Sequence, residues 1–260
     1  FSVQLPGQAD PEWAAFSGDQ FRVINHTRND RKLRRGALRG NRFTLTIRDL
    51  EGPMESIDDR LDVIARRGVP NYFGPQRFGR DGNNVEQGLA MLNDDRQRVS
   101  PHLRGILLSA MRSEIFNQIL SLRVQEESWN CGIPGDVFMF PDSKSHFEAD
   151  ASTDDIQQRL ERLEIHPSGP LVGAKPSIAR ESAAAIEERV FESLKEIFDG
   201  VSNTDLETMR RPYRLVPENL EWNQPEPKTL AISFTLPAGA YATTVLREVL
   251  HFDKTGMPEL

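Results

Sequence analysis

The chain has 260 residues, of which 38% are hydrophobic and 27% are charged, so it is long enough to bury the core of one large domain or two ordinary ones. Its apolar runs are too short for a membrane helix, and nothing resembles a basic-then-apolar targeting signal. Cys131 is the single cysteine, which excludes an internal disulfide and a thiolate-rich zinc site. We therefore expect a cytoplasmic protein.

The chain begins with FSVQLPG, which is typical of the middle of a strand and its exit, so we expect further sequence before Phe1. The net charge is -7, yet the stretch from Arg22 to Arg48 holds nine cations and one acid. This basic run has two interpretations: a solvated turn between strands, or a surface that contacts phosphates. The candidate phosphate contacts are Arg31, Lys32, Arg34, Arg35 and Arg39.

Apolar residues alternate with polar ones at 43–47 and again at 230–236, which predicts two strands with one buried face each. Between them most segments have helical periodicity. A capping-box-like pair, Ser56 and Asp59, predicts a helix that Gly68 ends. Further helices are predicted after Asn84, over 103–124 with an apolar stripe that includes Leu103, over 154–164 and over 182–198.

The composition changes along the chain. It is rich in arginine and glycine before about residue 95, mostly helical from there to about 215, and returns to a strand and a helix afterwards. This order suggests an insertion hung from a sheet-based core. Two consecutive domains remain the alternative.

Common enzyme motifs are absent: no phosphate loop, zincin or nucleophile-elbow pattern occurs. The five histidines have no metal-ligand spacing, so we expect no metal site. We expect Cys131 to be an ordinary buried residue rather than a nucleophile.

The segment GVPNYFGPQRFGR, residues 68–80, crowds aromatic rings and arginines between glycines and prolines. It is too broken to form a helix. Its rings must either turn back into the core or face a flat partner such as a nucleic-acid base. On the residues alone, both interpretations stay open.

Four blocks, GVPNYFGPQRFG, KLRRGALRGNRFTL, LLSAMRSEIFNQIL and LPAGAYATTVLREVL, closely resemble the TruD family of tRNA pseudouridine synthases. They are separated, in the family's order, and span nearly the whole chain. The resemblance implies an α+β fold, in which a mixed-sheet pseudouridine synthase core (1–97 and 216–260) is interrupted by a TruD-type α/β insertion domain (98–215). It also implies an isomerase that converts a tRNA uridine, uridine 13 in the family, to pseudouridine without a cofactor.

The resemblance also implies the substrate-binding residues. Phe73 would stack on the flipped uracil, Asn71 would help to hold the base or neighbouring backbone, and Tyr241 stands where the family commonly has phenylalanine. Phe73 should then be partly exposed, and its loss should leave folding nearly intact. The alternatives are that Phe73 is a core residue, that Tyr72 and Phe78 anchor the loop, and that Arg77 pairs with an acid such as Glu248.

The family's catalytic aspartate belongs to a G-x-K-D-x-x-A-type motif, which occurs nowhere in these 260 residues. We therefore expect no catalytic residue in this chain, and a separated N-terminal segment of the same protein as a possible partner beside tRNA. The alternatives are a noncatalytic RNA-binding remnant and, more remotely, an unrelated globular protein with a basic turn.

Overall fold

A computed structural model describes residues 3, 5, 11–13, 16–18, 21–32, 38–94, 99–141 and 143–251. The chain divides into two compact units, Phe1–Gly40 and Asn41–Leu260. In the first unit, β1 (Ser17–Gly18) pairs antiparallel with β2 (Phe21–Arg22). Within the described part of the chain, no helix is long and apolar enough to cross a membrane.

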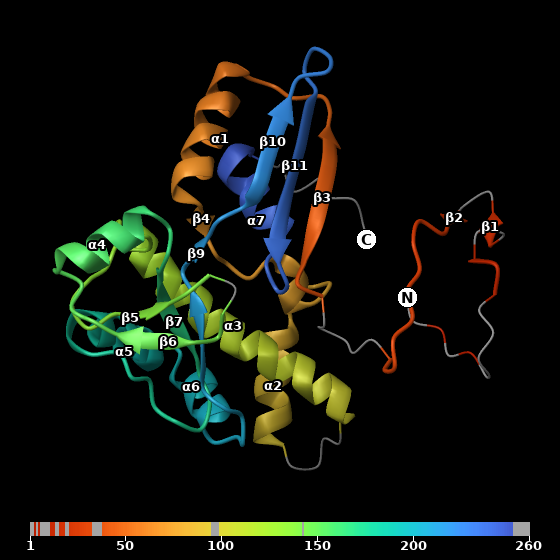
Figure 1. The fold of residues 1–260 in the computed structure, drawn as a ribbon. Coiled ribbons are helices and arrows are strands. Elements are labelled where there is room, and N and C mark those ends of the chain that lie inside the picture. Colours follow the sequence, from red (N-terminus) through yellow and green to blue (C-terminus); the bar gives the residue numbers. More distant parts are fainter. Residues whose placement is uncertain are drawn as a thin grey trace. The chain divides into compact units, whose positions relative to one another are not determined.

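A three-stranded sheet, in the order β10-β11-β3, forms one part of the second unit (Figure 1). Its strands are β3 (Gly40–Ile47), β10 (Glu218–Asn223) and β11 (Leu230–Pro237), so both strands predicted from alternation are confirmed. The helices α1 (Glu55–Arg67) and α7 (Ala242–Val249) share one core with this sheet. Its buried members include Leu61, Ile64, Leu230, Ile232, Phe234, Leu236, Val245 and Val249.

A four-stranded antiparallel sheet, in the order β6-β5-β7-β8, forms the other part. Its strands are β5 (Val137–Met139), β6 (His146–Glu148), β7 (His166–Leu171) and β8 (Met209–Pro212). The long helix α3 (Pro101–Gln125) packs against β7 and is surrounded by α2 (Asn84–Asn93), α5 (Glu181–Ser193) and α6 (Lys195–Ser202). A smaller core lies under α4 (Asp154–Glu161) and contains Phe138.

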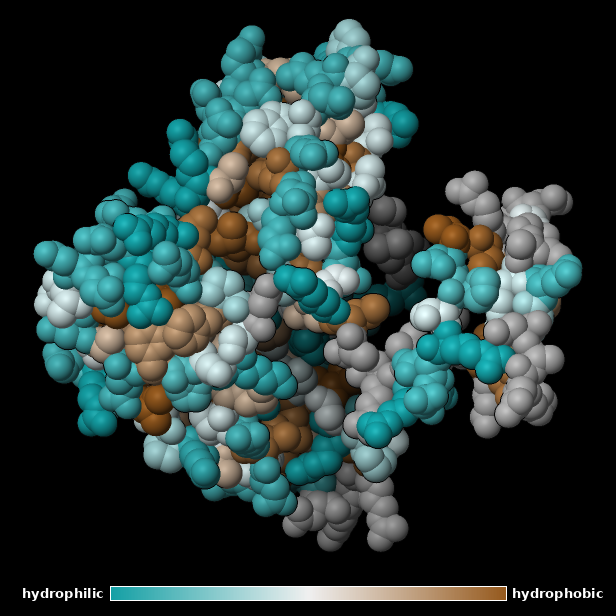
Figure 2. Space-filling view, viewed as in Figure 1, coloured by the Kyte–Doolittle hydropathy of each residue, from teal (hydrophilic) through white to brown (hydrophobic). Residues whose placement is uncertain are grey.

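One short segment, residues 209–215, links the two parts. After β8 the chain passes through Tyr213 into β9 (Arg214–Leu215), which pairs antiparallel with β4 (Val69–Pro70). Figure 2 shows hydrophobic residues only as separate patches among hydrophilic ones on the face it presents.

The predicted helices are confirmed, with differences at their ends. The helix α1 begins at Glu55 with Met54 as its N-cap and no side-chain cap, so the predicted capping box is wrong. Glu55 and Asp58 in its first turn instead suit the positive end of the helix dipole. The helix α4 ends at Glu161 rather than at residue 164, because Leu163 adopts a positive φ of 62°.

The single helix predicted over 182–198 is two helices, α5 and α6. They separate at Leu194, whose φ and ψ of -112° and 35° are not helical. Across the break, the rings of Phe191 and Phe198 stack with centroids 4.5 Å apart. Leu103 was predicted to lie in the core stripe of α3, but its side chain is exposed because the first turn of that helix extends beyond the core.

Candidate functional site

The segment 68–80 is an ordered loop between α1 and α2. Gly68 ends α1 with a positive φ of 71°, and a Cβ there would lie 2.5 Å from the carbonyl oxygen of Leu215. The pairing of β4 with β9 then fixes Val69 and Pro70. After Gly74 the chain turns through a short 3-10 helix, η2 (Pro75–Phe78). The rings between these fixed points are therefore held in place by the backbone.

Phe73 is buried, with 8% of its surface exposed, so the expectation of a partly exposed ring is wrong. The guanidinium carbon of Arg211 lies 4.0 Å from the ring centroid, in cation–π contact. The rings of Phe116 and Tyr241 lie edge-on at 5.6 Å and 6.2 Å. These neighbours cover the ring, and Phe73 belongs to the same core cluster as α3.

The backbone of Phe73 is clamped by one side chain of α3. The N–H of Phe73 donates to Asn117 Oδ1 at 2.9 Å, and Asn117 Nδ2 donates to the carbonyl of Phe73 at 3.0 Å. The Asn117 amide thus makes the pair of hydrogen bonds that a residue of a neighbouring strand would make. Both bonds act on one residue, so the backbone of Phe73 is held at its N–H and at its carbonyl.

Asn71 is also buried, and its amide is engaged within the protein. Its Nδ2 donates to the carbonyl of Pro212 at 2.9 Å, while its Oδ1 accepts from Arg211 Nη2 at 2.6 Å. Its backbone N–H donates to Tyr213 at 2.8 Å. One Nδ2 hydrogen remains for another partner, because a primary amide carries two donors. The role of Asn71 toward a base stays a prediction.

Tyr241 is half-buried at the start of α7 and lies beside the loop. A Cβ added to Gly74 would meet its Cδ1 atom at 3.0 Å, so glycine at this position permits the close approach. The structure therefore brings Asn71, Phe73 and Tyr241 together from segments about 170 positions apart along the chain.

A surface hollow of about 380 Å³ lies beside Phe73. It is lined by Phe73, Pro75, Phe78, Gly79, Arg80, Gly82, Asn117 and Arg247. Aromatic residues and cations in one hollow suit a planar ring joined to phosphates. Tyr72 and Phe78 are partly buried against the core around α3, as the anchoring interpretation expected.

The interpretation that pairs Arg77 with Glu248 is wrong. Arg77 Nη1 donates to Ser109 Oγ at 2.9 Å, and its guanidinium carbon lies 5.2 Å from the Phe73 centroid. Within the described ranges, no carboxylate forms an ion pair with Arg77 or Arg211. Burial and, to a smaller extent, the nearby Arg77 charge lower the pKa of Arg211 to about 10. Arg211 therefore remains charged at neutral pH.

The candidate phosphate contacts of the basic run belong to the first unit. Arg31, Lys32 and Arg39 are exposed, whereas Arg34 and Arg35 lie outside the described residues. The proposed phosphate contacts therefore stay a prediction. Cys131, expected to be buried, is exposed at the turn after α3, where its thiol donates to the carbonyl of Glu127 at 3.5 Å. Over the described ranges, no group of three His, Cys, Asp or Glu side chains could hold a metal ion.

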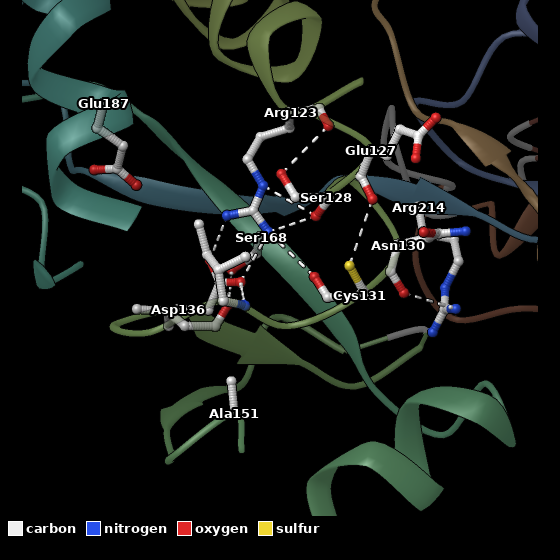
Figure 3. Close-up of polar contacts among 12 residues, drawn as sticks. Arg123, Glu127, Ser128, Asn130, Cys131, Asp136, Ala151, Ser168, Glu187 and Arg214 are labelled. Atoms are coloured by element: carbon white, nitrogen blue, oxygen red, sulfur yellow. Dashed lines mark hydrogen bonds and ion pairs between the residues drawn. The ribbon is translucent and has the colours of Figure 1, made fainter. Parts of the chain in front are cut away.

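A network of buried arginines around the four-stranded sheet went unnoticed in the sequence (Figure 3). Arg123 makes two 2.8 Å contacts with Asp136 and also donates to the carbonyls of Ser128 and Cys131. Arg210 pairs with Glu187 at 3.2 Å. These arginines hold together the loops and strands around the four-stranded sheet, so their first role is structural.

Arg214 completes this network from β9. Its Nε donates to His166 Nδ1 at 2.8 Å, and its Nη2 donates to the carbonyls of Leu160 and Ile165. Burial, together with the Arg214 charge, lowers the pKa of His166 to about 3, so this histidine is neutral and accepts the bond. Segment 209–215 thus supplies arginines to both the sheet and the Phe73 loop.

The α+β fold and the motif residues around Phe73 are those of a family of RNA-modifying enzymes. The profile of the family described as tRNA pseudouridine synthase D (TruD) matches residues 3–99 and 96–249. The chain belongs to the TruD family of tRNA pseudouridine synthases.

Relatives named tRNA pseudouridine synthase D match nearly the entire chain. The protein of Methylococcus capsulatus is 45% identical over 259 residues, covering 100% of this chain and 73% of the relative. That of Nitrosococcus oceani is 43% identical, with 100% and 74% covered. A crystal structure of a Methanosarcina mazei protein described as a TruD superimposes with a TM-score of 0.63 at 21% identity, over 85% of this chain and 71% of that one. The mixed α+β fold is therefore that of TruD.

Proposed function

We propose that this chain forms the substrate-binding part of a tRNA pseudouridine synthase, acting on uridine 13 of tRNA. The observation that carries the proposal is the meeting of Asn71, Phe73 and Tyr241, from two motif blocks of the family, with Phe73 lining an open hollow. In the reaction, the bond between uracil nitrogen and ribose C1′ breaks, the base turns, and a carbon of the ring bonds to C1′. The composition of the product equals that of the substrate, so no cofactor is required.

The hollow has the chemistry that this reaction needs. A base in folded RNA must leave its stack before its glycosidic bond can react, and the unstacking costs a few kcal/mol. An aromatic partner offsets about 1 to 3 kcal/mol of it per base. In this proposal the uracil meets Phe73 at the hollow, while Arg80 and Arg247 on its rim face the phosphates on either side.

The domain division belongs to the same proposal. Residues 1–97 and 216–260 form the pseudouridine synthase core and 98–215 the insertion domain, in a protein that works in the cytoplasm. The core shared by α1, α7 and the three-stranded sheet supports a separate sheet-and-helix part. Phe73, Met91 and Tyr241 of the proposed first part pack instead in the core around α3. Segment 209–215 is where the chain returns from one to the other.

A first prediction concerns turnover. Since the family's aspartate motif is not among these residues, the 260-residue chain is expected to form no pseudouridine in tRNA, as measured by carbodiimide mapping of position 13. Adding a segment that carries the motif should restore product if the two pieces associate. Product formed by the chain alone would place the catalytic carboxylate among the residues present. Failure to restore product, with intact tRNA binding, would favour the alternative of a noncatalytic RNA-binding protein.

A second prediction concerns the basic run. Replacing Arg31, Lys32, Arg34, Arg35 and Arg39 with alanine should weaken tRNA binding and flatten its salt dependence. Each lost phosphate contact removes about 0.7 to 0.9 from the slope of log affinity against log salt. The matched control replaces Arg66 and Arg67, two exposed cations at the end of α1, where we expect little change. An unchanged slope in the first variant would favour the interpretation of the basic run as a solvated turn.

A further inference from the structure

Arg211 contacts Asn71, the ring of Phe73 and the carbonyl of Gly239 at the candidate base site. Its Nη2 donates to Asn71 Oδ1 at 2.6 Å and its Nε to the carbonyl of Asn71 at 3.2 Å. Its Nη1 donates to the carbonyl of Gly239 at 3.1 Å, two residues before Tyr241. Its planar face lies 4.0 Å from the centroid of the Phe73 ring. One guanidinium therefore joins three chain segments.

We infer that Arg211 is a positioning residue, which fixes the ring of Phe73 and the amide of Asn71 for the target base. This inference rests on the proposed function. The guanidinium occupies one face of the Phe73 ring, so a base must stack on the part of the ring that lines the hollow. By bonding to Asn71 Oδ1, Arg211 also orients that amide, so that one Nδ2 hydrogen is left for another partner. A free N–H suits the carbonyl oxygens of uracil.

The geometry requires arginine rather than any cation. Three acceptors in different directions match the planar fork of a guanidinium, which also stacks on an aromatic face. A lysine ammonium would keep the charge but could not stack and span all three acceptors at once. Arg211→Lys is therefore expected to loosen the site without removing positive charge from it.

The test separates recognition of the base from attraction to the phosphates. The affinity of the chain is measured for tRNA with uridine at position 13 and for the same tRNA with an abasic residue there. The unsubstituted chain should prefer uridine by roughly 5- to 150-fold, which corresponds to about 1 to 3 kcal/mol of stacking at about 1.4 kcal/mol per tenfold. Arg211→Lys should reduce this preference to about threefold or less, with abasic affinity unchanged.

Arg112→Lys is the matched control. Arg112 is also half-buried, and among the described residues it bonds to two carbonyls, those of Leu171 at 2.6 Å and Glu207 at 2.8 Å. Its substitution should retain the uridine preference even if stability falls. Thermal denaturation shows whether each variant is folded. If Arg211→Lys does not fold, Arg211→Gln, which lacks the charge and the planar fork, is tested in its place.

The outcomes are distinguishable. If the unsubstituted chain has no preference for uridine over the abasic residue, the proposed base site itself is wrong. If it has the preference and folded Arg211→Lys or Arg211→Gln retains it, the base site stands and the positioning role of Arg211 is overturned. Loss of preference in the Arg112→Lys control as well would overturn it too, because the effect would then be general.

Discussion

Replacing Arg123 with methionine is expected to destabilise the chain by about 3 to 5 kcal/mol, because the change leaves the Asp136 carboxylate buried without its partner. The two side chains are each 1% exposed, and their closest contact is 2.8 Å. Burial disfavours the Arg123 charge, but Asp136 outweighs that effect and raises the pKa of the guanidinium above its ordinary value. Arg123 is therefore charged in the folded chain. Urea denaturation measures the loss.

The cost has a second component in the turn after α3. Arg123 donates to the carbonyls of Ser128 at 2.6 Å and Cys131 at 3.2 Å (Figure 3). Its guanidinium carbon also lies 5.2 Å from the centroid of the Tyr213 ring. Methionine makes none of these bonds. We expect the turn to loosen along with the ion pair, so Cys131 should react faster with a thiol reagent in the variant.

Two controls define the origin of the loss. Arg189→Met breaks an ion pair with Glu126 whose members are 58% and 42% exposed, and it should cost only about 0 to 1 kcal/mol. The double variant Arg123→Met/Asp136→Asn should lose less than the two single changes added together, because no unpaired charge stays buried. A loss below about 1 kcal/mol for Arg123→Met would contradict the account.

Local patterns were enough to predict most secondary structure. The alternation in β3 and β11 and the apolar spacing in α2 and α3 each report one buried face, and one face is what periodicity detects. The failures lie where a single residue decides. The break at Leu194 and the end of α4 depend on backbone angles that tertiary packing selects. Hydrophobic spacing does not predict these angles.

The candidate site was predictable only in part. Resemblance supplied Asn71, Phe73 and Tyr241, and the structure places them together. Arg211 was invisible, since it lies 140 positions from Asn71 and stands among other arginines in the segment RRPYR. Asn117 was equally hidden, because an asparagine within an apolar helix has many possible partners. Contacts between distant segments carry no local pattern, so the support of Phe73 needed coordinates.

Phe73→Ala is expected to destabilise the chain by about 3 to 5 kcal/mol and to abolish its preference for uridine at position 13. The structure reverses the earlier expectation of nearly intact folding, since the ring is 8% exposed within the central core. Removing it empties space between Phe116, Tyr241 and Arg211. The Arg211 guanidinium also loses its aromatic partner. Urea denaturation and the comparison of uridine with abasic tRNA measure the two effects.

Since Phe73→Ala disturbs both stability and the site, Phe73→Leu separates them. Leucine fills much of the cavity but offers no flat face, so stability should fall by less than with alanine while the uridine preference is still lost. Phe73→Tyr keeps the ring and should retain most of the preference. Phe138→Ala, in the core under α4, should cost similar stability and leave the preference unchanged. A folded Phe73→Leu variant that still prefers uridine would defeat the stacking role and leave Phe73 as a core residue, because leucine cannot provide the aromatic contact on which the proposal depends.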